Sequence, residues 1–374
     1  MTESPQARRK MLVICPFPVG VAAGQRLKYE QYFEDWRAFG FEITVSPFMD
    51  RALWEKLYEP GFYGRKAAGV LRGTFRRLRD LFRVGRYDVV YLHMNVTPVG
   101  TSLFERLTRA LARRLVYDLE DNVIGADGGT RRHPNPILRY LKGNGKSRYL
   151  VRKADHVVTS SPMLNERCVE LNERRACTYI SSSVDTDRFV PATPYDDSRK
   201  VTIGWTGTFS TSAYLDLLRP VFQELADRVD FRLKIIGNFD WELAGVDLEV
   251  VRWTAEREVE DLQAFDIGVY PLSFDDWVIG KSGLKAIQYM AFALPTVATA
   301  AGTTPRIIRH GENGLLVRTD REWVDALERL VRDAALRRRL GQAARRDAEA
   351  NYSVKAVAAD YRRVLTDVMR RNGT

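Results

Sequence analysis

The chain has few residues of the kinds that hold metal ions. Its 374 residues include only three cysteines and four histidines. Cys15, Cys168 and Cys177 lack the spacing of metal ligands, and no HExxH sequence or Cys/His cluster occurs. A protein-bound metal is therefore not expected. Cys15 ends an apolar run and is predicted to be a small core residue.

Long apolar runs are also missing. No stretch reaches the length of a transmembrane helix, and the first residues, MTESPQARRKMLVI, lack the apolar core of a signal peptide. No short-period repeat or low-complexity segment interrupts the chain. These absences favour a cytoplasmic protein, and the length favours two domains.

Basic residues outnumber acidic ones, giving a net charge of +10 and an isoelectric point near 9.5. This excess indicates an anionic partner, and nucleic acid, an anionic membrane and a nucleotide-sugar substrate all fit. Many of the cations lie in Arg65–Arg86, where apolar residues repeat at steps of three and four. This segment predicts a basic helix with one apolar stripe. Two alternatives remain: the stripe docks on its own domain, or the helix lies on a membrane surface.

Predicted strands and helices alternate along most of the chain. The expected strands of the first run are 11–15, 41–46, 88–92, 115–119, 156–159 and 178–180, and those of the second are 201–206, 231–236, 248–253, 267–270 and 295–299. Helices are expected between them, among them 25–39, 137–153 and 213–227. Alternation with buried, β-branched strands predicts an α/β fold with doubly wound parallel sheets. Pro191, Pro194 and a polar run separate the two halves. We expect an N-terminal domain (1–182), a linker (183–200), a C-terminal domain (201–353) and a closing helix (354–374).

The segment from Asp275 to Val317 carries the strongest chemical signal. Gly280, Lys281, Ser282 and Gly283 form a loop that opens a helix expected from about Leu284. The first turn of a helix has unpaired N–H groups, and the helix dipole favours an anion there. Lys285 and Gln288 follow Lys281 at helical spacing. A phosphate or diphosphate is the ligand such a site would hold. A loop that only connects two elements, without binding an anion, can have the same form.

The sequence GKSGLKAIQYMAFALPTVAT, followed by IIRHGENGLLV, resembles the donor-binding signature of family 4 GT-B glycosyltransferases. The resemblance implies two Rossmann-like domains facing a cleft and retaining transfer from a nucleotide sugar. Most family members carry two glutamates, eight positions apart, at positions that correspond to Gly280 and Gln288. This chain is similar to a branch that reads GK-S/C-G-x-K-x-x-QYMA. The amide of Gln288 can still hydrogen-bond a ribose.

The same resemblance assigns further donor-binding residues. It implies that the loops after the first strand of each domain lie beside the phosphates, and that the nucleobase packs near a tryptophan. The expected donor-binding set is Gly24, Arg26, Gly207, Thr208, Trp253, Thr254, Gly280, Ser282, Gly283, Leu284, Lys285 and Gln288. Arg26 could instead face solvent, and Trp253 could instead belong to the core.

Carboxylates follow the strand 115–119, where sites of α/β proteins gather. Glu120 or Asp121 is expected to hydrogen-bond a sugar hydroxyl or to assist deprotonation of the acceptor, although either carboxylate could instead cap a helix or loop. His93 ends the preceding strand and either faces the cleft or is a satisfied neutral side chain. Lys281, with Lys285 and the helix N–H groups, is expected to neutralise the leaving diphosphate without a divalent ion.

The sequence therefore predicts a metal-independent, retaining glycosyltransferase that needs no cofactor besides its nucleotide-diphosphate sugar. The acceptor is expected to be a glycan, a lipid-linked molecule or a small molecule. Two alternatives remain open: a GT-B nucleotide-sugar epimerase, and a non-catalytic protein that binds anions or nucleic acid on a degenerate GT-B body. Nucleic acid is the less favoured partner. A peripheral position on the inner face of the membrane, through Arg65–Arg86, is also compatible.

Overall fold

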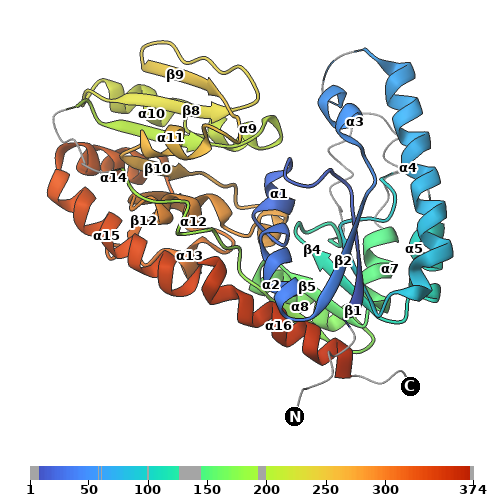
Figure 1. Ribbon diagram of the computed structural model, residues 1–374. Helices are drawn as coiled ribbons and strands as arrows, with labels where there is room; N and C mark the ends of the chain where they lie inside the picture. Colours follow the sequence, from blue (N-terminus) through green and yellow to red (C-terminus); the bar gives the residue numbers. More distant parts are fainter. Residues whose placement is uncertain are drawn as a thin grey trace. The chain divides into compact units, whose positions relative to one another are not determined.

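The computed structural model describes residues 8–57, 59, 61–98, 101–125, 145–192 and 199–370. These residues form two compact units, which we describe separately (Figure 1). Unit 1 comprises residues 1–181, 279–281 and 358–374, and unit 2 comprises residues 182–278 and 282–357. Parts of the expected linker (193–198) and of the helix expected before Lys153 (137–144) lie outside the described residues.

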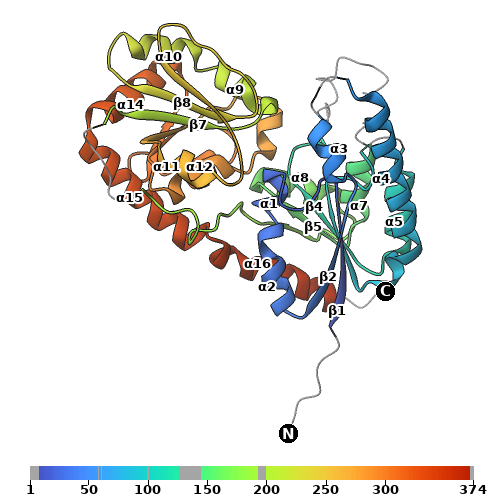
Figure 2. The same ribbon diagram turned by 45° about the horizontal axis from the view of Figure 1, so that its top comes forward.

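Unit 1 is built on a six-stranded parallel sheet of order β2-β1-β3-β4-β5-β6. Its strands are β1 (Arg9–Cys15), β2 (Phe41–Pro47), β3 (Val89–His93), β4 (Leu115–Leu119), β5 (His156–Thr159) and β6 (Cys177–Tyr179). Its helices are α1 (Ala23–Arg26), α2 (Phe33–Ala38), α3 (Arg51–Lys56), α4 (Tyr63–Arg83), α5 (Leu103–Leu111), α7 (Gly145–Lys153) and α8 (Pro162–Leu171), with short 3-10 turns η1 (Glu30–Tyr32) and η2 (Val84–Arg86). Helices cover both faces of the sheet, so the central strands are fully buried, as their apolar sequences require (Figure 2).

Unit 2 repeats this architecture with a parallel sheet of order β12-β11-β10-β7-β8-β9. Its strands are β7 (Thr202–Thr206), β8 (Arg232–Gly237), β9 (Asp247–Arg252), β10 (Ile267–Tyr270), β11 (Thr296–Thr299) and β12 (Gly314–Val317). Its helices are α9 (Ser212–Asp216), α10 (Arg219–Ala226), α11 (Glu258–Gln263), α12 (Leu284–Ala291), α13 (Thr304–Ile307), α14 (Asp320–Arg332) and α15 (Ala334–Asn351), with 3-10 turns η4 (Phe209–Thr211) and η5 (Asp276–Gly280). The expected α/β fold with two doubly wound parallel sheets is confirmed.

The last helix, α16 (Val354–Arg370), begins in unit 2, and its residues from Ala358 onward cluster with unit 1. There, Tyr361 is fully buried against the rings of Tyr32 and Trp36, at centroid distances of 4.6 and 5.6 Å. Through this aromatic cluster, α16 packs against the segment formed by η1 and α2.

Two helices expected to be continuous are interrupted. The segment expected as one helix over 25–39 consists of α1, η1 and α2. Gln25 and Glu30 in this segment hydrogen-bond the loop after β1, which holds the chain away from a continuous helix. The segment 213–227 is split into α9 and α10, and Pro220 stands in the first turn of α10. A proline removes a donor from the helix interior but fits its first turn, so the helix restarts there.

The orientation of α4 corrects one sequence-based alternative. Its buried face consists of Gly69, Gly73, Arg77 and Asp80, whereas the predicted apolar stripe is exposed. The interpretation that this stripe docks on its own domain is therefore wrong. The helix packs instead through glycines and a buried ion pair, because the glycines allow close backbone contact. A Cβ atom at Gly73 would lie 2.7 Å from the carbonyl oxygen of Phe48.

Candidate functional site

In unit 1, the loop after β1 is held in place by Gln25. Its amide donates to the carbonyl of Phe17 (3.1 Å) and accepts from the Phe17 N–H (3.0 Å). Gly24 follows this loop, and a Cβ atom there would lie 2.8 Å from Oε2 of Glu120. The absence of a side chain at Gly24 thus leaves room for the Glu120 carboxylate. The structure thus brings together Gly24 and Glu120, two of the predicted site residues.

Beneath Glu120 lies a buried charged cluster that the sequence analysis did not identify. Asp118, on β4, pairs with Nζ of Lys28 at 2.5 Å and lies 3.5 Å from Nδ1 of His93. The hydroxyl of Tyr91 donates to the same carboxylate at 2.7 Å. Burial favours the neutral acid, but Lys28 and His93 outweigh it and lower the pKa of Asp118 to about 2. His93 is therefore buried rather than open to solvent.

The pKa of Glu120 is shifted in the opposite direction from that of Asp118. Burial raises the pKa of this carboxyl, and the neighbouring charges of Asp121 and Asp118 raise it further, although Lys28 and His93 oppose them. A carboxyl with a raised pKa can exchange protons closer to neutral pH than an ordinary glutamate. This property fits the predicted role of Glu120 in proton transfer or in hydrogen bonding to a sugar hydroxyl.

Residues 279–281 belong to unit 1 by their contacts, although the residues on both sides belong to unit 2. Nζ of Lys281 pairs with Oδ1 of Asp121 at 3.1 Å. A Cβ atom at Gly280 would lie 2.3 Å from the backbone nitrogen of Asn122. Gly280, the position where the resemblance would expect a glutamate, therefore has no room for a side chain, because backbone occupies that space.

Two serines hold this short segment. The hydroxyl of Ser160 lies within hydrogen-bonding distance of the carbonyl oxygens of Glu120 and Gly280, the latter at 3.0 Å. The hydroxyl of Ser161 donates to the carbonyl of Ile279 at 2.5 Å. Both serines follow β5 directly. The Ser-Ser-Pro sequence at this strand end is the local signal for this anchor, and neither serine is among the residues predicted for the site.

In unit 2, Lys285 is the centre of a second group. Its Nζ lies 4.3 Å from the ring centroid of Trp205 and 3.3 Å from Oγ1 of Thr211. A Cβ atom at Gly207 would come within 2.8 Å of this ammonium group. The glycine turn after β7 and the first turn of α12 therefore meet at the carboxyl edge of the sheet, where ligands of α/β proteins bind. Thr208, also on this turn, is exposed and caps η4.

The start of α12 has the form expected from the sequence. Gly283 adopts a left-handed conformation (φ 76°), which turns the chain into the helix at Leu284. A Cβ atom at Gly283 would collide with Ile307 at 2.1 Å, so glycine is required there for two reasons. Ser282 is buried beside it. The N–H groups of the first turn have no preceding carbonyl within the helix, which suits an anion.

Gln288 is the most unusual polar residue of α12. Its side chain is almost fully buried, with a relative exposure of 6%. No hydrogen bond to its amide is formed by any of the residues that the structure describes. The amide is thus available to a ligand.

Three predicted residues remain: Trp253 and Thr254, which follow β9 in unit 2, and Arg26 in unit 1. Trp253 follows β9 and is half-buried. It is not part of the hydrophobic cluster around β7, β8 and β10, so the alternative of a core tryptophan is not supported. The hydroxyl of Thr254 accepts from the N–H of Arg257 at 3.3 Å and so supports the turn into α11. Arg26, in unit 1, is partly buried.

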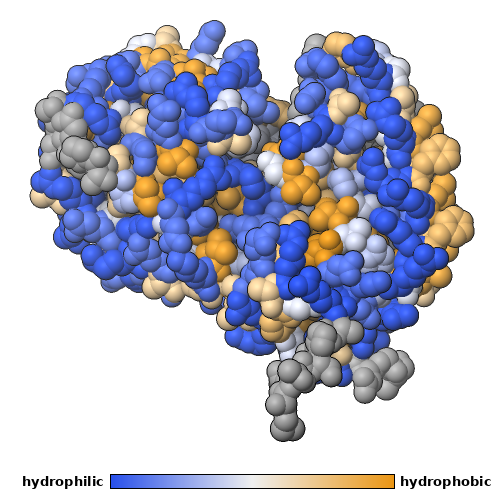
Figure 3. All heavy atoms as spheres, in the orientation of Figure 1, coloured by the Kyte–Doolittle hydropathy of each residue, from blue (hydrophilic) through white to orange (hydrophobic). Residues whose placement is uncertain are grey.

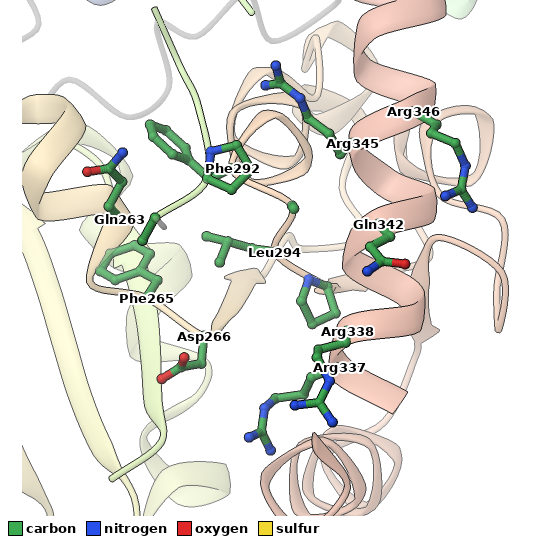
Figure 4. A pocket seen from close by; sticks show the side chains of 14 residues that line it. Gln263, Phe265, Asp266, Phe292, Leu294, Arg337, Arg338, Gln342, Arg345 and Arg346 are labelled. Carbon is green, nitrogen blue, oxygen red and sulfur yellow. The ribbon is translucent and has the colours of Figure 1, made fainter. Parts of the chain in front are cut away.

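A cavity of about 410 Å³ in unit 2 is lined by none of the predicted residues. Its lining combines apolar side chains such as Phe292 and Leu294 with arginines of α15 (Figure 4). Arg345 already donates to the backbone carbonyls of Ala291 and Thr186, and Figure 4 shows Arg346 extending away from the apolar side chains. We therefore do not assign the donor to this cavity.

Within the described ranges, no cluster of three or more His, Cys, Asp or Glu side chains suits a metal ion. No helix in the same part of the chain is long and apolar enough to cross a membrane.

Comparison with known proteins shows what the chain is similar to. Residues 200–333 match the family described as Glycosyl transferases group 1. Sucrose-phosphate synthase from Thermosynechococcus elongatus has a similar structure, with a TM-score of 0.69 at 14% identity over 98% of this chain and 100% of that one. HepE from Anabaena, solved in complex with UDP-glucose, gives a TM-score of 0.68 at 15% identity over 96% of this chain and 99% of that one. The fold is therefore that of the GT-B glycosyltransferases.

Among proteins of known activity, a D-inositol 3-phosphate glycosyltransferase from Corynebacterium aurimucosum is 30% identical over 223 residues. The match spans 51% of this chain and 51% of that relative, so the similarity covers about half of each protein. The family match, residues 200–333, lies almost entirely in unit 2, so this part of the chain is similar to a glycosyltransferase domain.

Proposed function

We propose that the protein is a retaining glycosyltransferase of family 4 that transfers a sugar from a nucleotide-diphosphate donor. The observation that carries this proposal is the state of Gln288: this buried residue has an amide without a hydrogen bond to any described residue, and it lies on the helix whose first turn presents Lys285 beside Gly207. A ribose hydroxyl supplies the hydrogen bond that the amide lacks, and the diphosphate accepts from Lys285 and the N–H groups of α12.

The phosphate charge is met by protein groups alone in this proposal. Lys285, Lys281 and the N-terminus of α12 stabilise the negative charge that develops on the leaving diphosphate. Glu120, with its raised pKa, hydrogen-bonds a sugar hydroxyl or takes the acceptor proton, assisted by Asp121. No protein nucleophile and no divalent cation is assigned.

The donor and the acceptor are suggested by the similar proteins. HepE was solved with UDP-glucose, and the C. aurimucosum relative is named for an inositol phosphate acceptor. We therefore propose UDP as the first nucleotide to test. A small phosphorylated polyol, a glycan or a lipid-linked molecule is the class of acceptor.

The proposal is tested by titrating UDP, GDP, ADP and TDP into the protein by calorimetry, with and without a chelator. One nucleotide is expected to bind at micromolar concentrations, with no loss on chelation. Gln288→Ala should weaken this binding by about fivefold, as expected for one neutral hydrogen bond. Gln342→Ala, which alters an exposed glutamine of α15, is the matched control.

Binding of none of the nucleotides, or equal affinity in the Gln288 variant, would contradict the proposed donor site. Incubation with the matching nucleotide sugars then separates the remaining classes. Slow hydrolysis to the free sugar supports a transferase, and conversion to an epimeric nucleotide sugar would replace it with an epimerase.

A further inference from the structure

Helix α4 is attached to unit 1 through a polar face. Arg77 is fully buried and donates to the backbone carbonyls of Cys15 (2.8 Å) and Val96 (2.6 Å). It also pairs with Asp80 at 3.0 Å. Close packing at Gly69 and Gly73 completes this attachment, because a Cβ at either position would come within 3 Å of a neighbouring residue. The face that carries these groups therefore points into unit 1, and this sets how the helix is rotated about its axis.

The opposite face of α4 is apolar and exposed. Leu71, Phe75, Leu78 and Phe82 follow one another at steps of four, three and four, and the two phenylalanines are 68% and 87% exposed. The neighbouring helix α5 adds three exposed leucines, Leu103, Leu107 and Leu111. We call these seven residues the α4–α5 apolar face. Figure 3 shows hydrophobic atoms along the margin where Figure 1 places α4. Contiguous exposed apolar groups on this scale mark a binding surface.

The charges around this face are mostly positive, although two of its arginines pair with acids of neighbouring segments: Arg72 with Asp50 at 3.0 Å and Arg113 with Asp88 at 3.5 Å. Arg72, Arg79 and Arg86 border it on α4 and its 3-10 extension, and Arg106 and Arg113 lie on or beside α5. The acids of the two helices, Asp80 and Glu105, are both buried. A second copy of this chain docked through the same face would bring Arg79, Arg86 and Arg106 of both copies together, and α4 and α5 offer no exposed acid to pair them. An anionic partner with an apolar interior complements both properties.

We propose that the α4–α5 apolar face binds the surface of an anionic membrane. Phe75 and Phe82 enter the boundary between headgroups and acyl chains, while the bordering arginines contact the lipid phosphates. The attachment is reversible, because one amphipathic surface without a lipid anchor holds a protein only weakly. This proposal does not rest on the proposed enzymatic activity.

Sedimentation with vesicles tests it. The full chain is expected to sediment with vesicles containing phosphatidylglycerol at low salt, to bind phosphatidylcholine vesicles weakly, and to be released at high salt. Phe75→Ser combined with Phe82→Ser should lower the fraction bound by about tenfold. Arg79→Gln combined with Arg86→Gln should lower binding only to the anionic vesicles. Arg77 is not a suitable target, because its replacement would disrupt the buried attachment of α4.

Phe274→Ser is the matched control, since Phe274 is an exposed phenylalanine of unit 2. It should bind vesicles like the wild type, and far-ultraviolet circular dichroism should show that every variant is folded. The proposal is overturned if the wild type stays in the supernatant, or if the phenylalanine pair has no effect. It is equally overturned if light scattering shows a dimer that the pair dissociates, or if single-stranded nucleic acid binds through these residues while vesicles do not.

Discussion

At the scale of single residues, Lys281 and Lys285 are the two cations that the sequence placed together, and the structure separates their contacts. Lys281 pairs with Asp121 in unit 1, whereas Lys285 lies over Trp205 in unit 2. Only four positions separate the two lysines, but residues 279–281 belong to unit 1 and the residues from 282 onward belong to unit 2. The two lysines therefore have different neighbours.

Replacement of Lys281 by alanine is expected to lower turnover by roughly 10²-fold, as for one lost group that stabilises charge in the transition state. The measurement is steady-state kinetics with saturating donor. Lys355→Ala, which removes an exposed lysine paired with Asp187, serves as the control. Unchanged turnover in the Lys281 variant would leave this lysine with only an anchoring role.

The buried Lys28–Asp118 pair gives a prediction about pH. The pKa of Asp118 is lowered from 3.8 to about 2, so the unfolded chain binds this proton more readily than the folded one. The pair therefore stabilises the fold fully above pH 3.8, and this contribution is lost as the pH falls towards 2.

Asp118→Asn leaves the ammonium of Lys28 buried without its charge partner. The free energy of unfolding at neutral pH should fall by roughly 3–5 kcal/mol, and the difference from the wild type should shrink towards pH 2. Denaturant titrations at several pH values measure both. A second variant that also carries Lys28→Met should recover part of the loss. Equal stability of Asp118→Asn and the wild type at neutral pH would show that the pair contributes nothing.

At the scale of elements, α4 shows how glycine decides which face of a helix is buried. The apolar residues of the helix would favour burial of the opposite face on periodicity alone. Gly69 and Gly73 allow the backbone to approach Leu53 and Phe48 more closely than any side chain permits. The interior of unit 1 accepts this glycine face together with the Arg77–Asp80 pair.

The same substitution at two glycines of α4 separates packing from helix propensity. Gly73→Ala should destabilise the protein by about 1–3 kcal/mol, because the methyl group overlaps the carbonyl oxygen of Phe48. Gly64→Ala meets no atom within 4 Å and should be neutral or stabilising by up to about 1 kcal/mol. Thermal unfolding of the two variants gives the comparison. Equal effects at both sites would mean that α4 is not packed as described.

At the scale of the whole molecule, the chain forms two compact units, and the last helix, α16, packs in the first of them. Tyr361 of α16 packs in unit 1 beside residues more than three hundred positions earlier. The stability of unit 1 therefore depends on α16, a helix that follows unit 2 in the chain.

Tyr361→Ala should weaken unit 1 by roughly 3–5 kcal/mol, the range for a buried aromatic side chain. Hydrogen exchange is the suitable measurement, since a chain with two units need not unfold in one step. Protection should fall in β1 and α2 and stay unchanged in β8 and α10. Arg363→Ala, on the exposed side of the same helix, should leave the protection of both units unchanged. Loss of protection spread equally over both units would contradict a local role.

The sequence by itself determined the α/β class, the position of most strands and the start of α12. Strands buried on both faces must be apolar throughout, and Gly283 followed by a regular helical pattern marks a helix start whatever its surroundings. These features depend on residues close together in the chain, so they can be read locally. The tertiary structure decided which side chains meet: Glu120 above Lys28 and Asp118, Lys285 over Trp205, Gly280 against Asn122, and the outward direction of Phe75 and Phe82. Each of these contacts or exposures depends on how distant segments pack, and no local pattern of charge or hydrophobicity specifies that packing.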